Sequence, residues 1–180
     1  MAEPSPPDLD ALAPGSSVLC LGSDRQTGRA AIRSVLTAAD DERTAVLLVT
    51  TDEPRAAVDA LLERGVAADA LGLVDASGAE ISIDGVAEAD AVADPGSLSA
   101  LGIATSDVLD RLGHRFDRVW IGPDSTSDVV DSASVPAAFR FLHVLTGRVR
   151  TSEAILAASM DASAHEEETQ RTIAELFDET

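Results

Sequence analysis

The chain of 180 residues contains no lysine, a single cysteine, and few aromatic residues, which make up 3% of the sequence. One cysteine cannot form a disulfide within the chain, and the position of Cys20 in an apolar run predicts a small core residue. No apolar run approaches the roughly 20 residues of a membrane-spanning helix, and the first residues lack the basic and apolar regions of a signal peptide. We therefore expect a cytoplasmic protein without an internal disulfide.

Negative charge dominates the composition. Aspartate and glutamate total 32 and arginine 13, which gives a formal net charge of −19. Acidity of this degree without lysine resembles proteins of salt-loving archaea, and an acidic protein from an ordinary salt environment is the alternative. Molar salt shortens the Debye length to about 3 Å, so the charges repel one another little beyond contact distance. Nucleic-acid binding is not expected, because no basic cluster offsets the acidic surface.

Strand-like and helix-like segments alternate along the chain. Apolar runs predict strands at residues 18–21, 44–50, 71–75, 118–121 and 154–158. Helical spacing predicts helices that begin near residues 29, 54, 96 and 163, and one that contains residues 139–145. The alternation predicts one α/β domain over residues 11–180, with a mainly parallel sheet and helices on both faces, after an acidic, proline-rich tail at residues 1–10.

The remaining segments have weaker patterns. Residues 40–42 are all acidic and predict a surface turn. Residues 79–92 are interpreted as an edge hairpin or a surface insertion. Residues 124–134 are rich in serine and aspartate, which indicates a solvated loop. Three histidines are scattered without the spacing of a zinc site.

The first predicted strand leads into a loop that has the layout of a phosphate-binding loop. A working loop of this kind reads G-x-x-x-x-G-K-[ST]. Here Gly22 and Gly28 are one residue further apart, Arg29 stands in the lysine position, and Ala30 stands in the hydroxyl position. Arginine keeps the charge but is a planar fork, and each charge-assisted hydrogen bond that is lost is worth about 1.5–3 kcal/mol. Alanine also removes a magnesium ligand. The sequence therefore predicts no efficient ATPase.

Four segments in this order resemble the RecA superfamily, in particular its KaiC/RadA-like branch and haloarchaeal members of unknown function. The similarity extends over residues 11–177, and the fourth segment is the most specific. The resemblance implies a RecA-like P-loop three-layer sandwich, with the first strand inside the sheet. The segments are residues 13–22 (APGSSVLCLG), 48–54 (LVTTDEP), 118–125 (RVWIGPDS) and 139–150 (FRFLHVLTGRVR) with nearby residues 160–165.

The resemblance also implies roles for particular residues. Asp52 and Glu53 fall where the family places carboxylates that activate water, and Asp124 falls where it places the acid on the magnesium side. Asp124 follows Gly122-Pro123, which we interpret as an insertion that moves it away from the strand end. Each acid also has a structural interpretation, as a helix or loop cap. The vestigial nucleotide loop would comprise Gly22, Ser23, Asp24, Thr27, Gly28, Arg29 and Ala30.

Three functional hypotheses follow. The first is a non-catalytic domain that acts in regulation or signalling through a protein partner or self-association. The second is a weak or atypical ATP-binding protein or ATPase, in which Arg29 holds phosphate, Glu53 orients water, and magnesium accompanies the nucleotide. The third is a response-regulator-like module, which would need a lysine that the chain lacks. Arg140, Arg148 and Arg150 are either a contact for a partner or anion, or ordinary surface ion pairs.

Overall fold

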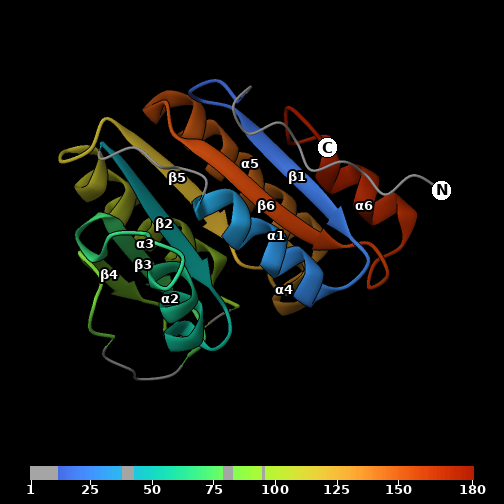
Figure 1. Cartoon of the computed structure of the whole chain (residues 1–180). Helices are drawn as coiled ribbons and strands as arrows, with labels where there is room; N and C mark the ends of the chain where they lie inside the picture. Colours follow the sequence, from blue (N-terminus) through green and yellow to red (C-terminus); the bar gives the residue numbers. More distant parts are fainter. Residues whose placement is uncertain (1–11, 38–42, 79–82, 95) are drawn as a thin grey trace.

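Six parallel strands form the central layer of the protein, in the order β1-β6-β5-β2-β3-β4 (Figure 1). The structure is a computed structural model and describes residues 12–37, 43–78, 83–94 and 96–180. The expected parallel α/β architecture is confirmed, because every neighbouring pair of strands is parallel. The strands are β1 (Ser17–Gly22), β2 (Thr44–Thr50), β3 (Leu71–Asp75), β4 (Glu88–Ala91), β5 (Arg118–Pro123) and β6 (Ile155–Asp161).

Helices cover both faces of the sheet and enclose two hydrophobic cores (Figure 1). All seven residues of β2 and of β6 are buried, as expected for parallel strands covered on both sides. One face carries α1 (Arg25–Thr37) and α2 (Pro54–Leu62). The other carries α3 (Leu98–Gly113), α4 (Thr126–Ser132), α5 (Val135–Ser152) and α6 (Glu167–Ala174), and a short 3₁₀ turn, η2 (Ala68–Ala70), precedes β3.

The expected interior position of the first strand is wrong, because β1 lies at one margin of the sheet. The last strand, β6, lies between β1 and β5 and pairs with β1 over its full length. Within the described ranges, the backbone on the outer side of β1 bonds to the last residues of the chain, where the Leu19 N–H donates to the Glu179 carbonyl oxygen at 3.0 Å. Strand order depends on how the helical crossovers fold back, which the apolar pattern of a single strand does not specify.

Three local predictions are also wrong. Helix α1 begins at Arg25, four residues before the position expected from its apolar spacing. Residues 126–132 form helix α4 rather than a solvated loop. Strand β4 is parallel to β3 and therefore cannot be the second arm of a hairpin. The predicted tail at residues 1–10, the acidic turn at 40–42 and part of the segment at 79–92 lie outside the described residues.

No helix in the described ranges combines the length and the apolar character that crossing a membrane requires. The cellular compartment stays a prediction.

Candidate functional site

Polar side chains lie where the central strands end, on the face that α1 covers. Because β2, β5 and β6 are parallel, their carboxyl ends meet at one edge of the sheet. Thr50, Asp124 and Ser159 lie at this edge and are all buried. The Thr50 hydroxyl donates to Asp124 Oδ2 at 3.3 Å. This edge is where α/β proteins of parallel topology place their ligands.

Asp124 directly follows strand β5, so the predicted displacement by an insertion is wrong. Gly122 and Pro123 are themselves the last residues of β5 and pair with β2. The Asp124 N–H then donates to the Val49 carbonyl oxygen at 2.7 Å. Proline fits there because its nitrogen faces β6, whose pairing with β5 covers only Trp120 and Ile121.

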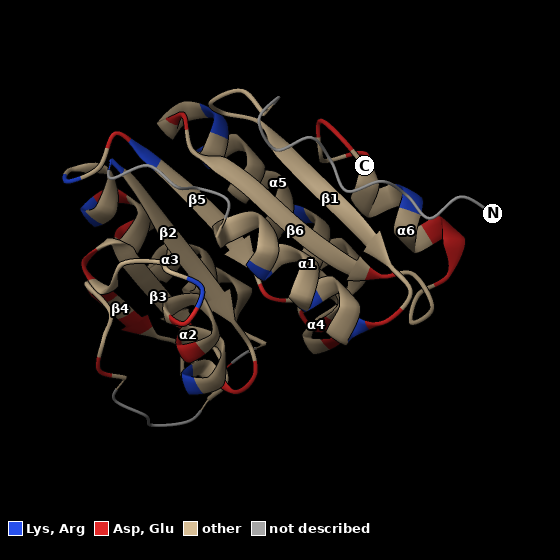
Figure 2. Ribbon diagram, viewed as in Figure 1, with Lys and Arg blue, Asp and Glu red and all other residues tan. Residues whose placement is uncertain are grey.

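Helix α1 directs a row of arginines at this edge, visible as blue segments along α1 (Figure 2). Arg25, Arg29 and Arg33 are four residues apart and therefore share one side of the helix. Arg29 Nε lies 3.4 Å from the Asp124 carboxylate, and Arg33 Nη2 lies 3.5 Å from it. The single carboxylate that ends β5 is therefore contacted by two guanidinium groups.

Further aspartates surround the same arginines. Arg29 also contacts Asp128 of α4 at 2.7 Å and Asp52 at 3.2 Å. Arg25 forms ion pairs with Asp128, at 2.7 Å, and with Asp131. The Thr51 hydroxyl donates to Asp128 at 2.8 Å. We call these groups the arginine–aspartate cluster; they are Arg25, Arg29, Arg33, Asp52, Asp124, Asp128 and Asp131.

The charges in the cluster largely neutralise one another. The Asp124 side chain is fully buried, and burial raises the pKa of its carboxyl above the ordinary value although Arg33 and Arg29 act to lower it. Burial lowers the pKa of the Arg29 guanidinium, but Asp124 and Asp128 outweigh this and hold it above its ordinary value. Three guanidinium groups thus face four carboxylates at the edge where a nucleotide-binding domain would hold phosphate and metal.

The predicted nucleotide loop is a tight turn. Only Ser23 and Asp24 separate β1 from α1. Asp24 caps the helix, since its carboxylate accepts the Thr27 N–H and the Thr27 hydroxyl, each at 2.8 Å. These hydrogen bonds, the backbone one first, lower the pKa of Asp24. The Gly28 N–H donates to the Asp24 carbonyl oxygen at 3.1 Å, so Asp24 occupies amide groups that could face a phosphate.

Gly28 lies against the sheet, whereas Ala30 points to solvent. A Cβ added to Gly28 would lie 2.9 Å from Ser159 Oγ, so glycine lets α1 approach the sheet closely. Ala30 is exposed on α1 and forms no part of the cluster. Gly22, Ser23, Asp24, Thr27 and Gly28 are therefore brought together, but as a helix-capping turn.

The two candidate water-activating acids, Asp52 and Glu53, have different surroundings. Asp52 is more than half exposed and pairs with Arg29. Glu53 precedes α2 with a φ of 42° and makes no side-chain cap hydrogen bond. Non-glycine residues rarely adopt this left-handed conformation, and it points to a constrained corner between β2 and α2.

Most of the cluster lies outside the site residues predicted from the sequence. Asp128 and Asp131 lie in residues 124–134, whose composition indicates a solvated loop, and no motif in the sequence points to Arg25 or Arg33. A signal was present: Ser125 and Asp128 have the spacing of a helix cap, and the Ser125 hydroxyl indeed accepts the Asp128 N–H at 3.2 Å. This cap begins α4, which carries Asp128 and Asp131 to the arginines.

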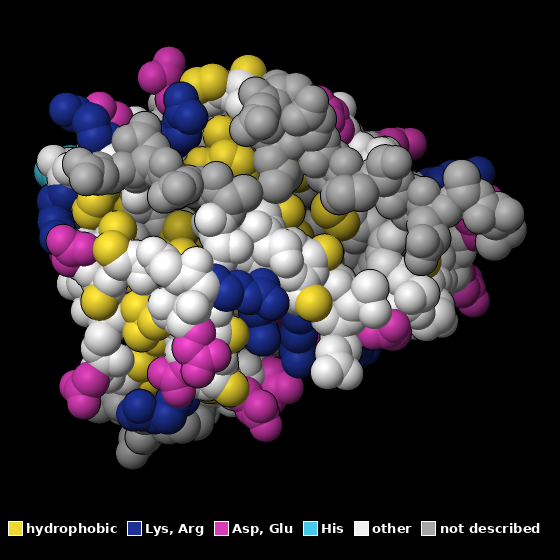
Figure 3. Space-filling view, viewed as in Figure 1, with side chains coloured by type: hydrophobic (Ala, Val, Ile, Leu, Met, Phe, Trp, Pro, Cys, Tyr) yellow, Lys and Arg dark blue, Asp and Glu magenta, His cyan; other side chains and the backbone are white. Residues whose placement is uncertain are grey.

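An open groove of about 500 Å³ lies over the cluster. Figure 3 shows basic side chains gathered beside α1 on this face, among acidic ones. No group of three or more His, Cys, Asp or Glu side chains in the described part of the chain is arranged to hold a metal ion. The groove is lined by Arg25, Arg29, Thr51, Asp52, Asp128, Asp131 and Ser132.

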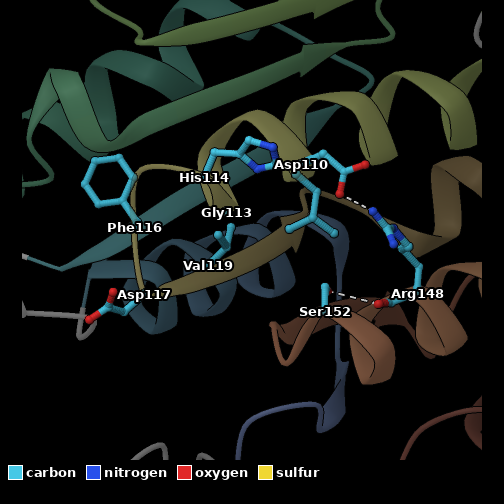
Figure 4. Close-up of a pocket in the computed structure, with 9 residues that line it drawn as sticks. Asp110, Gly113, His114, Phe116, Asp117, Val119, Arg148 and Ser152 are labelled. Carbon is cyan, nitrogen blue, oxygen red and sulfur yellow. Dashed lines mark hydrogen bonds and ion pairs between the residues drawn. The ribbon is translucent and has the colours of Figure 1, made fainter.

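A second cavity, of about 250 Å³, lies near the opposite end of the sheet, beside the start of β5 (Figure 4). Its charged side chains already have partners, since Arg148 pairs with Asp110 and Asp117 pairs with Arg43. Arg150 pairs with Asp178 at 3.2 Å. Two of the three arginines proposed as a partner contact are therefore engaged in intramolecular ion pairs.

The pH dependence of stability should change in an Asp124→Asn variant. The folded protein binds the Asp124 proton more tightly than the unfolded chain, because burial raises this pKa above 3.8. Protonation of Asp124 therefore increases the free energy of unfolding as pH falls from neutrality through the folded-state pKa towards 3.8. Asparagine cannot bind that proton, so the unmodified protein should gain stability relative to the variant over this interval. Denaturant titrations at several pH values measure the difference, and a constant difference would contradict the assignment.

Comparison with known proteins gives one family. A profile described as "Family of unknown function (DUF7504)" matches residues 15–180, which include every residue of the cluster. None of the curated proteins searched matches the chain.

Proposed function

We propose that the chain, which belongs to the DUF7504 family of unknown function, is a non-catalytic domain of the RecA/KaiC-like type that acts in regulation or signalling through protein contacts. The margin position of β1 departs from the sheet that this resemblance implies, so the likeness rests on the strand–turn–helix opening and on the parallel strands β2, β5 and β6. The observation that carries this proposal is the occupation of the sheet edge by the protein's own charges. Asp124, the candidate magnesium-side acid, is buried against Arg29 and Arg33.

Side chains of the protein itself occupy the positions that a phosphate and a metal ion would take. A magnesium ion at Asp124 would have to displace two guanidinium groups and also lose part of its hydration, which it does reluctantly. A phosphate at the start of α1 would meet the Asp24 carboxylate, which already accepts hydrogen bonds there. The presence of these side chains supports the proposal that the architecture of a nucleotide site persists here as a structural ion cluster.

The direct test is a titration of the purified chain with ATP and magnesium in molar salt. We expect no magnesium-dependent hydrolysis above the level of an Asp124→Ala variant, because Arg29 contacts Asp124 and Asp128 instead of being positioned for phosphoryl transfer. Isothermal titration calorimetry and phosphate release measure the result. Robust turnover that disappears in Asp124→Ala would refute the proposal.

The second candidate is a weak or atypical ATP-binding protein of the KaiC/RadA-like branch, which the open groove favours. Arg25 and Arg29 line that groove and could turn from aspartates to phosphate oxygens. For this second candidate we expect micromolar affinity for ATP. Arg29→Ala should abolish that affinity, and the matched Arg29→Lys variant should retain part of it. Equal affinity in all three proteins would exclude Arg29 as a phosphate ligand.

A further inference from the structure

The two margins of the sheet differ in how they resist pairing with other strands. Strand β4 is four residues long and carries two carboxylates, one of which, Glu88, forms ion pairs with Arg111 and Arg115. Strand β1 has six residues and no charge, in a chain with 32 acidic residues. Short, charged strands protect a sheet edge, whereas an uncharged apolar edge is a site for strand addition.

Counting partners among the described residues, only half of the backbone groups on the outer side of β1 are hydrogen-bonded. Even-numbered residues of β1 face β6, as the bond from the Ala162 N–H to the Gly22 oxygen illustrates, so Ser17, Leu19 and Leu21 face outward. Asp178 and Glu179, which we call the C-terminal strap, bond Ser17 and the Leu19 N–H. Among the described residues, no hydrogen-bond partner is present for the Leu19 carbonyl oxygen or for the N–H and carbonyl groups of Leu21. Leu21 is 38% exposed.

The strap is held by backbone hydrogen bonds to Ser17 and Leu19 and by the carboxylate of Asp178. Asp178 Oδ2 accepts the Ser17 N–H and the Ser17 hydroxyl, each at 2.9 Å, and Arg150 contacts the other oxygen. Both strap residues are exposed, while Phe177 directly before them is buried in the core. The strap can therefore leave β1 without removing α6 or Phe177 from the core.

The outward groups of β1 are complementary to those of a second β1 strand that runs antiparallel. With Cys20 of both copies opposite each other, Leu19 of one lies opposite Leu21 of the other, and each such pair can exchange two hydrogen bonds. This pairing needs the Leu19 N–H, which the strap occupies. We propose that the β1 edge is a self-association surface for a second copy of this chain, and that the C-terminal strap competes for it.

This inference rests on the proposed function, since it names the partner in a protein contact. Its electrostatics are distinctive. Two copies each carry a net charge of −19 and repel one another, while the paired strands themselves carry no charge. Screening by salt should therefore strengthen the association rather than weaken it.

The test loosens the strap in the full chain with Asp178→Ala and measures mass by sedimentation in molar salt. We expect a shift from monomer to dimer, with a dissociation constant at least about tenfold lower than that of the unmodified chain. Cys20 provides a second readout. In the paired strands its Cα lies about 4.5 Å from that of the other copy, within disulfide range, so added oxidant should link the copies. Cys20→Ser should remove the link and keep the dimer.

A matched pair of variants at Leu21 isolates the strand edge. Leu21→Pro in the Asp178→Ala background removes an outward donor without touching the β6 pairing and should restore the monomer. Leu21→Ala keeps the donor and should leave the dimer. A folded Asp178→Ala protein that stays monomeric, or a dimer that Leu21→Pro does not affect or that fails to link through Cys20, would overturn the proposal. The ATP titration is independent of these results, so either proposal can fail alone.

Discussion

Replacement of Arg29 by alanine should lower the free energy of unfolding by about 3–5 kcal/mol, because it leaves a buried carboxylate without its nearer cation. Asp124 is fully buried, and Arg33, its other cation, lies 3.5 Å away through a single nitrogen. The same substitution removes one of the two ion pairs, each at 2.7 Å, that join α1 to Asp128; the other is formed by Arg25. Denaturant titration in molar salt measures the loss.

Two further variants separate charge from shape. Arg29→Lys keeps the charge but cannot span Asp52, Asp124 and Asp128 with one planar group, so we expect an intermediate loss. Asp124→Asn combined with Arg29→Ala removes the unpaired charge, and the double variant should recover part of the stability lost in Arg29→Ala alone. If the two substitutions were simply additive, Arg29 and Asp124 would not be coupled and the cluster would have no structural role.

The apolar pattern was sufficient to predict most of the fold. Strands β2 and β3 have the predicted bounds, because a strand buried on both faces is a continuous apolar run between polar turns. Strand β4 was not predicted, because half of its sequence, EADA, is charged. It lies at the margin of the sheet, where partly buried and exposed residues alternate. Single strands carry no information about their neighbours, so the margin position of β1 was equally hidden.

The candidate site was predictable in place but not in content. The proximity of Arg29 to the carboxyl ends of the strands follows from a strand–turn–helix opening in a parallel sheet. The strand-end position of Asp124 was not predicted, because Gly122-Pro123 was interpreted as an insertion although both residues belong to β5. The role of Arg29 could not be predicted in the same way. A phosphate-loop motif indicates which residues would bind phosphate, but it gives no information about the aspartates of α4 that contact Arg29. Asp128 lies 99 residues from Arg29 in sequence, yet the two side chains are in contact.

Close packing of α1 on β5 is what brings the arginines to Asp124, and it depends on glycine at position 122. A Cβ on Gly122 would lie 2.6 Å from Leu36 Cδ1 and 2.9 Å from Ile32 Cγ2. Both side chains are fully buried under α1. The helix therefore lies directly on the β5 backbone, two residues before Asp124, and this fixes the height of Arg29 and Arg33 above the carboxylate.

Leu36→Ala should lower the free energy of unfolding by about 2–5 kcal/mol, since it removes a fully buried side chain and leaves a cavity over Gly122. Gly122→Ala alone should cost about 1–3 kcal/mol through overpacking. Together the costs should fall short of their sum, by about 0.5–3 kcal/mol, because the new methyl group enters the space that Leu36 vacates.

The coupling should be incomplete, since Ile32 still lies close to the added methyl group. Denaturant titrations of the two single variants and the double variant in molar salt give the coupling energy directly. Strict additivity would mean that α1 does not rest on the β5 backbone at Gly122, and the arginines would then lack the support that places them at Asp124. Because the cluster depends on this contact, the double variant should also keep more of the Asp124 pH dependence than Gly122→Ala alone.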